Sequence, residues 1–279
     1  MKRPSTRSDQ RGTSLVELLV SMVLVALVVG AGMREFPIRT RAIDQEYLLV
    51  SMEQNLRQAA GMVSDPLRGA GDGVPKSNLA TWIPWISGFS ANPKITTVTG
   101  SPATISIARC STQPVATLSA TATTGAISIS VTSNISGATL SSLFDTSTQR
   151  LVLIGRDNAH VTAVGSGTLT IDTNPTVALA QGLTHSYGPG TPVCRVDVVT
   201  FAIATDSTTG RPQLRMNENQ GGGWSSVAEG ITDLQITTVD PGKRFQIFLT
   251  AETERSISST GATLFRTLRT DVTVRNALL

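Results

Sequence analysis

A single apolar segment near the N-terminus constrains the fold of this chain more than any other feature. Residues 13–33 read TSLVELLVSMVLVALVVGAGM and contain one ionisable side chain. A helix rises about 1.5 Å per residue, so the segment would be about 31 Å long, close to the hydrocarbon thickness of a bilayer. We therefore expect a membrane-spanning helix here.

Basic residues gather just before the apolar segment. Residues 1–12 hold four basic side chains against the single acid Asp9, whereas the rest of the chain carries equal numbers of basic and acidic side chains. The formal net charge of +3 therefore belongs to a short N-terminal stretch. A neutral body without a cluster of basic residues argues against a dedicated nucleic-acid-binding protein.

The one ionisable residue in the apolar segment, Glu17, needs an explanation. A carboxylate inside an apolar helix costs about 2.5–3.5 kcal/mol on insertion scales, so a compensating partner is expected. Cleavage between Gly12 and Thr13 would create an α-amine one helical turn before Glu17, where the helix dipole also favours negative charge. The same two groups on staggered neighbouring helices can pair, which would neutralise both charges inside an apolar bundle.

These residues resemble the start of a type IV prepilin. In that family a short basic leader ends in Gly, followed by a start residue, three small or apolar residues, Glu and an apolar stretch. The resemblance implies that prepilin peptidase cuts after Gly12, that Thr13 is the methylated N-terminus, and that Glu17 is the assembly glutamate. The chain departs from the family at Thr13, where Phe is usual; because cleavage relies mainly on the Gly, we expect processing to survive this change.

Two simpler interpretations compete with a prepilin. Residues 1–32 could form an ordinary secretory signal, with Gly-Ala-Gly at 30–32 as a small-residue cleavage site. The apolar segment could instead be a plain signal anchor. Neither interpretation accounts for Glu17, five residues after the Gly that ends the basic stretch, so we favour the prepilin.

The helix is expected to continue beyond the membrane segment (13–33) as an amphipathic stalk over residues 34–64. An apolar stripe recurs there at spacings of four and three residues; its members are Leu48, Met52, Leu56, Ala59 and Val63. Pro37 should kink the helix or open it locally. Asp65, Pro66 and the glycines at 69–73 should end it.

Residues 65–279 are expected to form a β-rich globular head with two parts. Residues 74–194 are rich in Ser, Thr and Gly and contain only short alternating runs. Residues 195–279 alternate more regularly, most clearly at 245–251, which predicts an antiparallel sheet. One face of that sheet must be covered, and the helix stripe is the obvious cover. The predicted fold class is therefore α+β, a long helix packed on a sheet, as the resemblance to pilins also implies.

The last third of the chain carries a second resemblance. The segments VAEGITDLQI at 227–236 and LRTDVTVRN at 268–276 are similar to the C-terminal region of PilW-type minor pilins. They are also similar to the related J-type pseudopilins of type II secretion systems. The resemblance implies a minor pilin, with a minor pseudopilin as the alternative that shares its fold and processing.

No motif in the sequence predicts an enzyme, a cofactor site or a metal site. His160 and His185 lie far apart, and neither has a second type of metal ligand near it in the sequence. Acidic and amide side chains elsewhere occupy turn-like positions, where such groups bond their own backbone; these are Asp172, Asn174, Asp206 and Asp240.

Two pairs of residues stand out in the predicted head. Cys110 and Cys194 are candidates for a disulfide, because the head would fold outside the cytoplasm. Trp82 and Trp85 occur in an otherwise aromatic-poor chain, and they suit either a local core anchor or a contact on another subunit.

We interpret the sequence as a minor pilin that performs no chemistry. It would be held in the bacterial inner membrane by its helix and then assembled into a filament at the cell surface. The family implies as partners prepilin peptidase, the inner-membrane assembly platform, other minor pilins, the major pilin and a tip adhesin. The alternative from another class is a membrane-anchored extracytoplasmic binding protein or enzyme, which would be indifferent to replacement of Glu17 by alanine.

Overall fold

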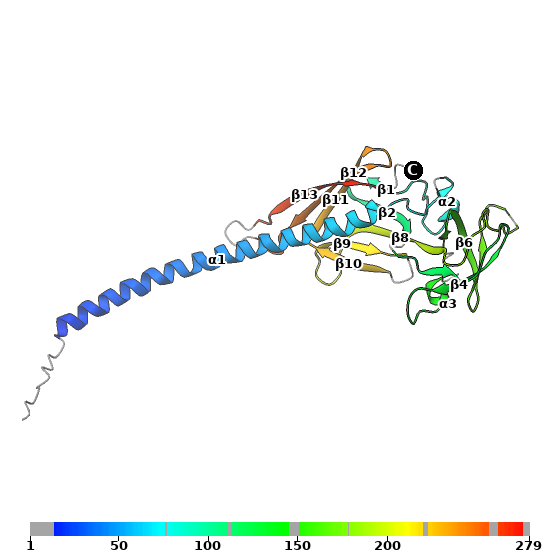
Figure 1. Ribbon diagram of the computed structural model, residues 1–279. Coiled ribbons are helices and arrows are strands. Elements are labelled where there is room, and N and C mark those ends of the chain that lie inside the picture. Colours follow the sequence, from blue (N-terminus) through cyan, green and yellow to red (C-terminus); the bar gives the residue numbers. More distant parts are fainter. Residues whose placement is uncertain are drawn as a thin grey trace, which may run out of the picture.

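The computed structural model describes residues 14–75, 77–110, 113–144, 151–177, 179–219, 223–256 and 262–275. Within these ranges the molecule is one very long helix followed by a β-rich head (Figure 1). The helix, α1, spans Leu15–Arg68, and its first half projects away from the head. The fold is α+β, as the sequence predicts.

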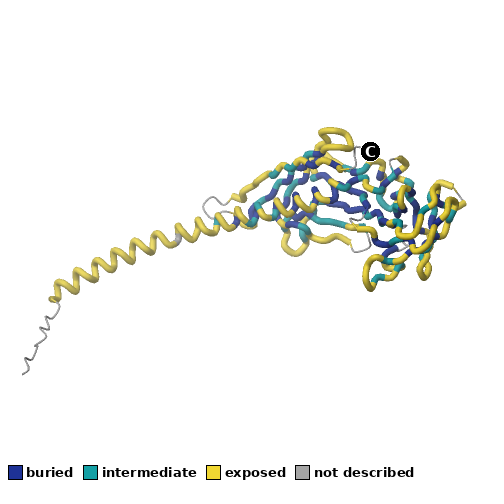
Figure 2. The backbone as a smooth tube through the Cα atoms, in the orientation of Figure 1, coloured by how far each residue is buried: buried dark blue, intermediate teal, exposed yellow. Residues whose placement is uncertain are grey.

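The two halves of α1 differ in burial, as the colours of Figure 2 show. Every described side chain between residues 14 and 44 is exposed. The apolar stripe is buried from Leu48 onwards, and Ala59 and Val63 are completely shielded from solvent. The prediction that this stripe covers the β-rich head is confirmed.

Helix α1 ends about one turn later than the sequence suggested. Pro66 lies inside the last turn, and the helix stops at Gly69, whose N–H donates to the Pro66 carbonyl at 3.1 Å. Leu67 is completely buried, and this packing outweighs the one helical hydrogen bond that a proline removes. The helix is continuous across position 37, and the kink expected at Pro37 stays a prediction.

The longest strand, β8 (Pro192–Thr205), organises the head. Its second half pairs with β2 (Ser101–Cys110) on one side and with β9 (Pro212–Asn217) on the other. Strands β1 (Lys94–Val98) and β10 (Trp224–Glu229) lie outside these two. All of these pairings are antiparallel, so this part of β8 is the centre of a sheet in the order β1-β2-β8-β9-β10.

The first half of β8 belongs instead to a closed barrel. It pairs with two strands at once, and the described strands close in the order β8-β3-β4-β7-β6-β5. The other strands of the barrel are β3 (Ala116–Leu118), β4 (Ser128–Ser133), β5 (Leu151–Ile154), β6 (Asp157–Val164) and β7 (Thr168–Asp172). Apolar side chains fill the interior, including Phe144 just after the short helix α3 (Leu140–Leu143). Because the sheet closes on itself here, the Ser- and Thr-rich part of the chain still has a core of its own.

The C-terminal strands form a separate antiparallel sheet, β11 (Ile231–Asp240), β12 (Arg244–Glu252) and β13 (Phe265–Thr273). The sequence suggested one sheet over 195–279, but the chain changes sheets at Gly230. This residue has a φ of +72°, and a β-carbon there would lie 2.9 Å from the Glu252 carbonyl oxygen. Only glycine makes such a corner without strain, and the corner separates β11 from β10.

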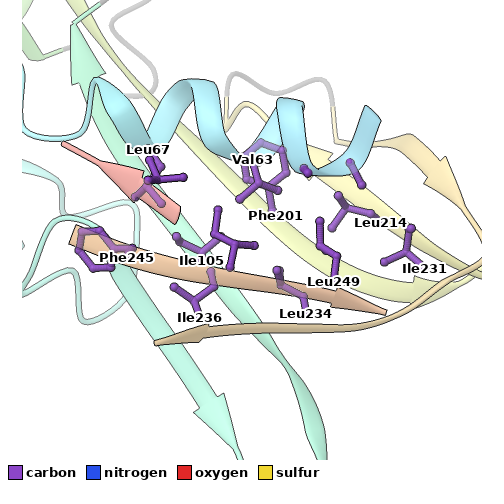
Figure 3. Close-up of a cluster of buried hydrophobic side chains, with 14 of the residues drawn as sticks. Val63, Leu67, Ile105, Phe201, Leu214, Ile231, Leu234, Ile236, Phe245 and Leu249 are labelled. Carbon is purple, nitrogen blue, oxygen red and sulfur yellow. The ribbon is translucent and has the colours of Figure 1, made fainter. Parts of the chain in front are cut away.

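The main core lies where the buried half of α1 meets both sheets (Figure 3). Val63 and Leu67 of the helix point toward side chains of the two sheets, among them Phe201 of β8 and Leu249 of β12. The helix is therefore an integral part of the core and not a cover laid on one sheet.

A third apolar cluster lies between the barrel and the sheet around β2. It contains Ile83 and Phe89 from the segment that includes the short helix α2 (Leu79–Trp82), with Trp82 and Trp85 half-buried against it. These tryptophans thus pack as the core anchor that was one of the two interpretations. Nearby, a disulfide joins Cys110 at the end of β2 to Cys194 in β8, with a Cα–Cα distance of 5.8 Å.

Candidate functional site

The start of α1 places an acidic side chain in the first turn of an apolar helix. Ser14 is the N-cap residue, with an extended backbone and no side-chain capping bond. Its carbonyl accepts the N–H of Leu18 at 3.1 Å, which closes the first turn around Glu17. Four N–H groups at a helix start lack intrahelical partners, and the dipole favours a negative charge at this end.

Glu17 is the one ionisable side chain among the described residues of the membrane-length segment, and it lacks a partner. The hydroxyl of Ser21 is satisfied within the helix, because its Oγ donates to the Leu18 carbonyl at 2.8 Å. In the part of the chain that the structure describes, the Glu17 carboxylate has no hydrogen bond and no ion pair. It lies among exposed apolar neighbours such as Leu15 and Val16. A carboxylate in such surroundings is stable only with a partner from outside the described residues.

The apolar surface around Glu17 has the length and hydropathy of a membrane span. The segment has a mean hydropathy of 2.5, and none of it is buried inside the protein. This is the one candidate span among the described residues. The two other residues that the sequence assigns to this site, Gly12 and Thr13, lie outside the described residues.

Between the apolar segment and the head, α1 carries charges that pair along the helix. Arg39 contacts Glu35 at 3.1 Å, four residues before it, and both side chains are exposed. Pairs of this spacing support an isolated helix by a few tenths of a kcal/mol. None of the head side chains that the structure describes contributes to this pair.

Two polar side chains of α1 attach the helix to the large sheet. Asn55 donates through Nδ2 to the Glu229 carbonyl at 3.1 Å, and Gln58 donates through Nε2 to the Val227 carbonyl at 2.9 Å. These carbonyls lie on β10, the edge strand of the large sheet, so the helix amides occupy that edge. The direction of the helix relative to the head is thereby fixed on this side.

On the other side, Glu53 joins α1 to the three-stranded sheet. Its carboxylate pairs with Arg57 at 2.8 Å and with Arg266 of β13 at 3.3 Å. The hydrogen bond from Arg57, and after it the charge of Arg266, hold the pKa of Glu53 below its ordinary value. Sequence reasoning missed this contact because Arg266 lies 213 residues further along the chain.

The comparison with known families addresses the N-terminal segment. Residues 7–33 match the model described as the prokaryotic N-terminal methylation motif. The motif is of the prepilin type. It supports a pilin-like or pseudopilin-like protein that prepilin peptidase processes, that the N-terminal helix anchors in the inner membrane and that assembles with other pilins. No curated protein and no solved structure matched the chain.

Two of the acids predicted at turns, Asp206 and Asp172, accept hydrogen bonds from nearby backbone N–H groups. Asp206 accepts the N–H groups of Thr208 and Thr209 at 2.7 and 2.8 Å, and Asp172 accepts that of Asn174 at 2.9 Å. Among the described residues, no group of three or more His, Cys, Asp or Glu side chains is placed to hold a metal ion.

The two histidines have closer partners than the sequence suggested. His185 contacts the Asp157 carboxylate, with Nδ1 and Oδ1 3.1 Å apart, although no acid is near it in sequence. Burial opposes ionisation of Asp157, but hydrogen bonds from Thr184 and His185 outweigh it and lower the pKa of this carboxyl group. His160 lies in β6 as expected for a strand residue, but it is buried and not at the surface.

Proposed function

We propose that this chain is a minor pilin of a type IV pilus. In this proposal prepilin peptidase removes residues 1–12 by cutting after Gly12, and Thr13 becomes the methylated N-terminus. The helix holds the subunit in the inner membrane, and Glu17 pairs with the N-terminal amine of a neighbouring subunit during assembly. The head then forms part of the filament surface or tip. The chain itself performs no chemical step.

The observation that carries this proposal is the unpaired Glu17 carboxylate within a segment that matches the methylation motif. A staggered neighbour would bring its positively charged terminus to Glu17, because one helical turn separates residue 13 from residue 17. The pairing would remove the cost of a charge in an apolar bundle. A plain membrane anchor gives no reason for an acid at this position.

Two features of the rest of the chain support a low-copy role. The head contains a barrel in addition to the sheets packed on α1, and the mature chain would be longer than is usual for a major pilin. The segments at 227–236 and 268–276 carry the resemblance to PilW-type minor pilins; the first spans parts of β10 and β11, and residues 268–273 of the second belong to β13. We infer other minor pilins, the major pilin, the assembly platform and a tip adhesin as partners.

The resemblance of those two segments to J-type pseudopilins favours a second candidate, a minor subunit of a type II secretion pseudopilus. Deletion of the gene separates the two machines. A minor pilin predicts loss or shortening of surface pili with normal exoprotein secretion, and a pseudopilin predicts the reverse.

Replacement of Glu17 by Gln tests the assembly mechanism. The variant keeps the size of the side chain but removes its charge, so we expect normal membrane insertion and cleavage but at least a tenfold loss of the protein from purified filaments. Glu35→Gln, an acid on the same helix beyond the apolar segment, is the matched control and should assemble normally. Normal incorporation of the Glu17→Gln protein would contradict the proposal.

A further inference from the structure

A cavity lies between α2 and the outer wall of the barrel at β6 and β7. Helix α2 and strand β6 belong to the part of the head far from the start of α1 (Figure 1). Its volume of about 540 Å³ falls within the range of small-molecule pockets, about 300–1,000 Å³. The lining residues are Thr81, Pro84, His160, Val161, Thr162, Asp172 and Pro175. None of them takes part in the proposed assembly through α1.

Cross-strand pairing brings the two titratable side chains of the cavity together. His160 on β6 lies directly opposite Asp172 on β7, and side chains at such positions share one face of a sheet with β-carbons about 5 Å apart. The neighbouring residues Ala159 and Ile171 fill the barrel interior, so this pair faces outward. A register shift between Val161 and Ala163 follows immediately, and bulges of this kind redirect side chains at the rims of barrels.

The α2 segment closes the cavity on one side and fixes the histidine. The ring of Trp82 meets the His160 ring edge-on at 5.2 Å between centroids, and the ring of Trp85 lies at 6.5 Å. His160 Nε2 is 2.8 Å from the Trp82 carbonyl oxygen. A carbonyl only accepts, so this contact assigns the ring proton to Nε2 and leaves Nδ1 with an acceptor lone pair. Burial lowers the pKa of His160, which keeps the ring neutral at neutral pH.

Asp172 presents a free acceptor beside this neutral ring. Its Oδ1 accepts the N–H groups of Asn174 and Gln181 at 2.9 and 3.0 Å. Its Oδ2 has no hydrogen bond or ion pair among the described residues. The backbone bonds hold the carboxylate in place, so Oδ2 can accept from a ligand without reorganisation of the side chain.

We propose that this cavity binds a neutral saccharide. A sugar ring offers hydroxyl donors that match the free carboxylate oxygen of Asp172, and it offers an apolar C–H face that matches Pro84 and Pro175. Thr81 and Thr162 also lie on the wall. The Thr162 hydroxyl donates to the Thr170 carbonyl at 3.2 Å, so its oxygen can accept from a ligand hydroxyl. Among the described residues no Lys or Arg lines the cavity, so an anionic ligand would meet the charge of Asp172 without compensation from these side chains.

Saturation-transfer NMR on the full chain in phosphocholine micelles tests this site, because sugar-headed detergents would compete for it. The probes are methyl β-D-glucopyranoside, methyl β-D-galactopyranoside and methyl α-D-mannopyranoside, with propylammonium as the cationic alternative. We expect saturable binding of at least one glycoside. Asp172→Asn retains an oxygen for the two backbone N–H groups but replaces Oδ2 by a donor, so affinity for that glycoside should fall about tenfold or more.

The matched control is Asp240→Asn, an exposed acid at the end of β11, which should bind like the unaltered chain. Thr162→Phe, which places an aromatic ring at the cavity wall, provides a second test if Asp172→Asn does not fold, and it should block glycoside binding. Three results would overturn the saccharide site: no glycoside binds, propylammonium binds in their place, or both cavity variants retain full affinity. Because no readout involves filament assembly, failure here would leave the proposed function untouched.

Discussion

The two halves of α1 form one continuous helix, but different interactions stabilise each half. The described side chains of residues 15–44 are all exposed, and apolar side chains surround the axis along the membrane-length part. From Leu48 to Leu67 one apolar stripe is buried, and from Met52 onwards it packs against the two sheets, whereas Leu49, Val50 and Met62 on the other faces are exposed. A helix that is apolar all round needs a membrane or other helices, whereas an amphipathic helix needs a folded domain. The first half is therefore built for partners outside the chain and the second half for the head.

The largest expected effect is a loss of head stability when a leucine in the buried half of α1, but not one in the exposed half, is replaced by alanine. Leu56→Ala removes a side chain that is only 2% exposed in the main core, and we expect the free energy of unfolding of the head to fall by about 2–5 kcal/mol. Leu24→Ala is the same substitution at a position that is 57% exposed, and it should leave head stability unchanged. Thermal unfolding of the full chain in detergent, followed by near-UV circular dichroism, measures both. If the two substitutions lowered the stability of the head equally, the two halves of α1 would not differ in their contribution to the head's core.

A decrease in pH should also destabilise the head, whereas the helical structure of the exposed half of α1 should not change. His160 has its pKa lowered from an ordinary value of 6.5 by burial, so protonation favours the unfolded head. The stability that this group contributes is complete above pH 6.5 and decreases as the pH falls below it. Asp157 has its pKa lowered from 3.8, and its contribution is lost only as the pH falls below that value.

We therefore expect the unfolding temperature of the head to fall as the pH decreases below 6.5, while the helical signal of α1 in detergent persists. His160→Gln removes the titrating ring and should flatten this pH dependence. An unchanged slope in the variant would show that another group is responsible. Differential scanning calorimetry across the pH series gives the measurement.

A smaller effect is expected where the helix amides meet the edge strand. Asn55→Ala and Gln58→Ala each remove a hydrogen bond to a carbonyl of β10. Both sites are near solvent, so water replaces the donor, and the cost should be about 1 kcal/mol for each variant. Hydrogen exchange should accelerate in β10 and not in the barrel. Unchanged protection of β10 in both variants would contradict the role of these amides.

The smallest expected effect concerns the exposed stretch before the head. Arg39→Ala breaks a pair in which both side chains are largely exposed, and the head should lose less than about 0.5 kcal/mol of stability. A larger loss would reveal a contact between this stretch and the head. Chemical denaturation of the full chain in detergent is sensitive enough to set this limit.

Local patterns in the sequence were sufficient to predict the helix, its buried stripe and many of the strands. The alternation predicted over residues 195–279, clearest at 245–251, corresponds to strands such as β8 and β12. These features depend on residues close together in the chain, so the period of apolar residues reveals them.

Contacts between distant residues could not be predicted in the same way. The closure of the barrel depends on pairing of β5 with β8, and nothing in the alternation of β8 shows that its two halves have different neighbours. The change of sheet at Gly230 and the ion pair of Glu53 with Arg266 also depend on tertiary structure. At the N-terminus, by contrast, Glu17 was identified from sequence because a charge in an apolar segment is anomalous wherever the rest of the chain lies.

Mass analysis of the N-terminal peptide from native cell envelopes tests the central claim most directly. The account predicts a mature chain that begins at Thr13 and carries one methyl group on its α-amine, four residues before an unmodified Glu17. Recovery of chains that retain residues 1–12, from cells whose prepilin peptidase is active on other pilins, would contradict it.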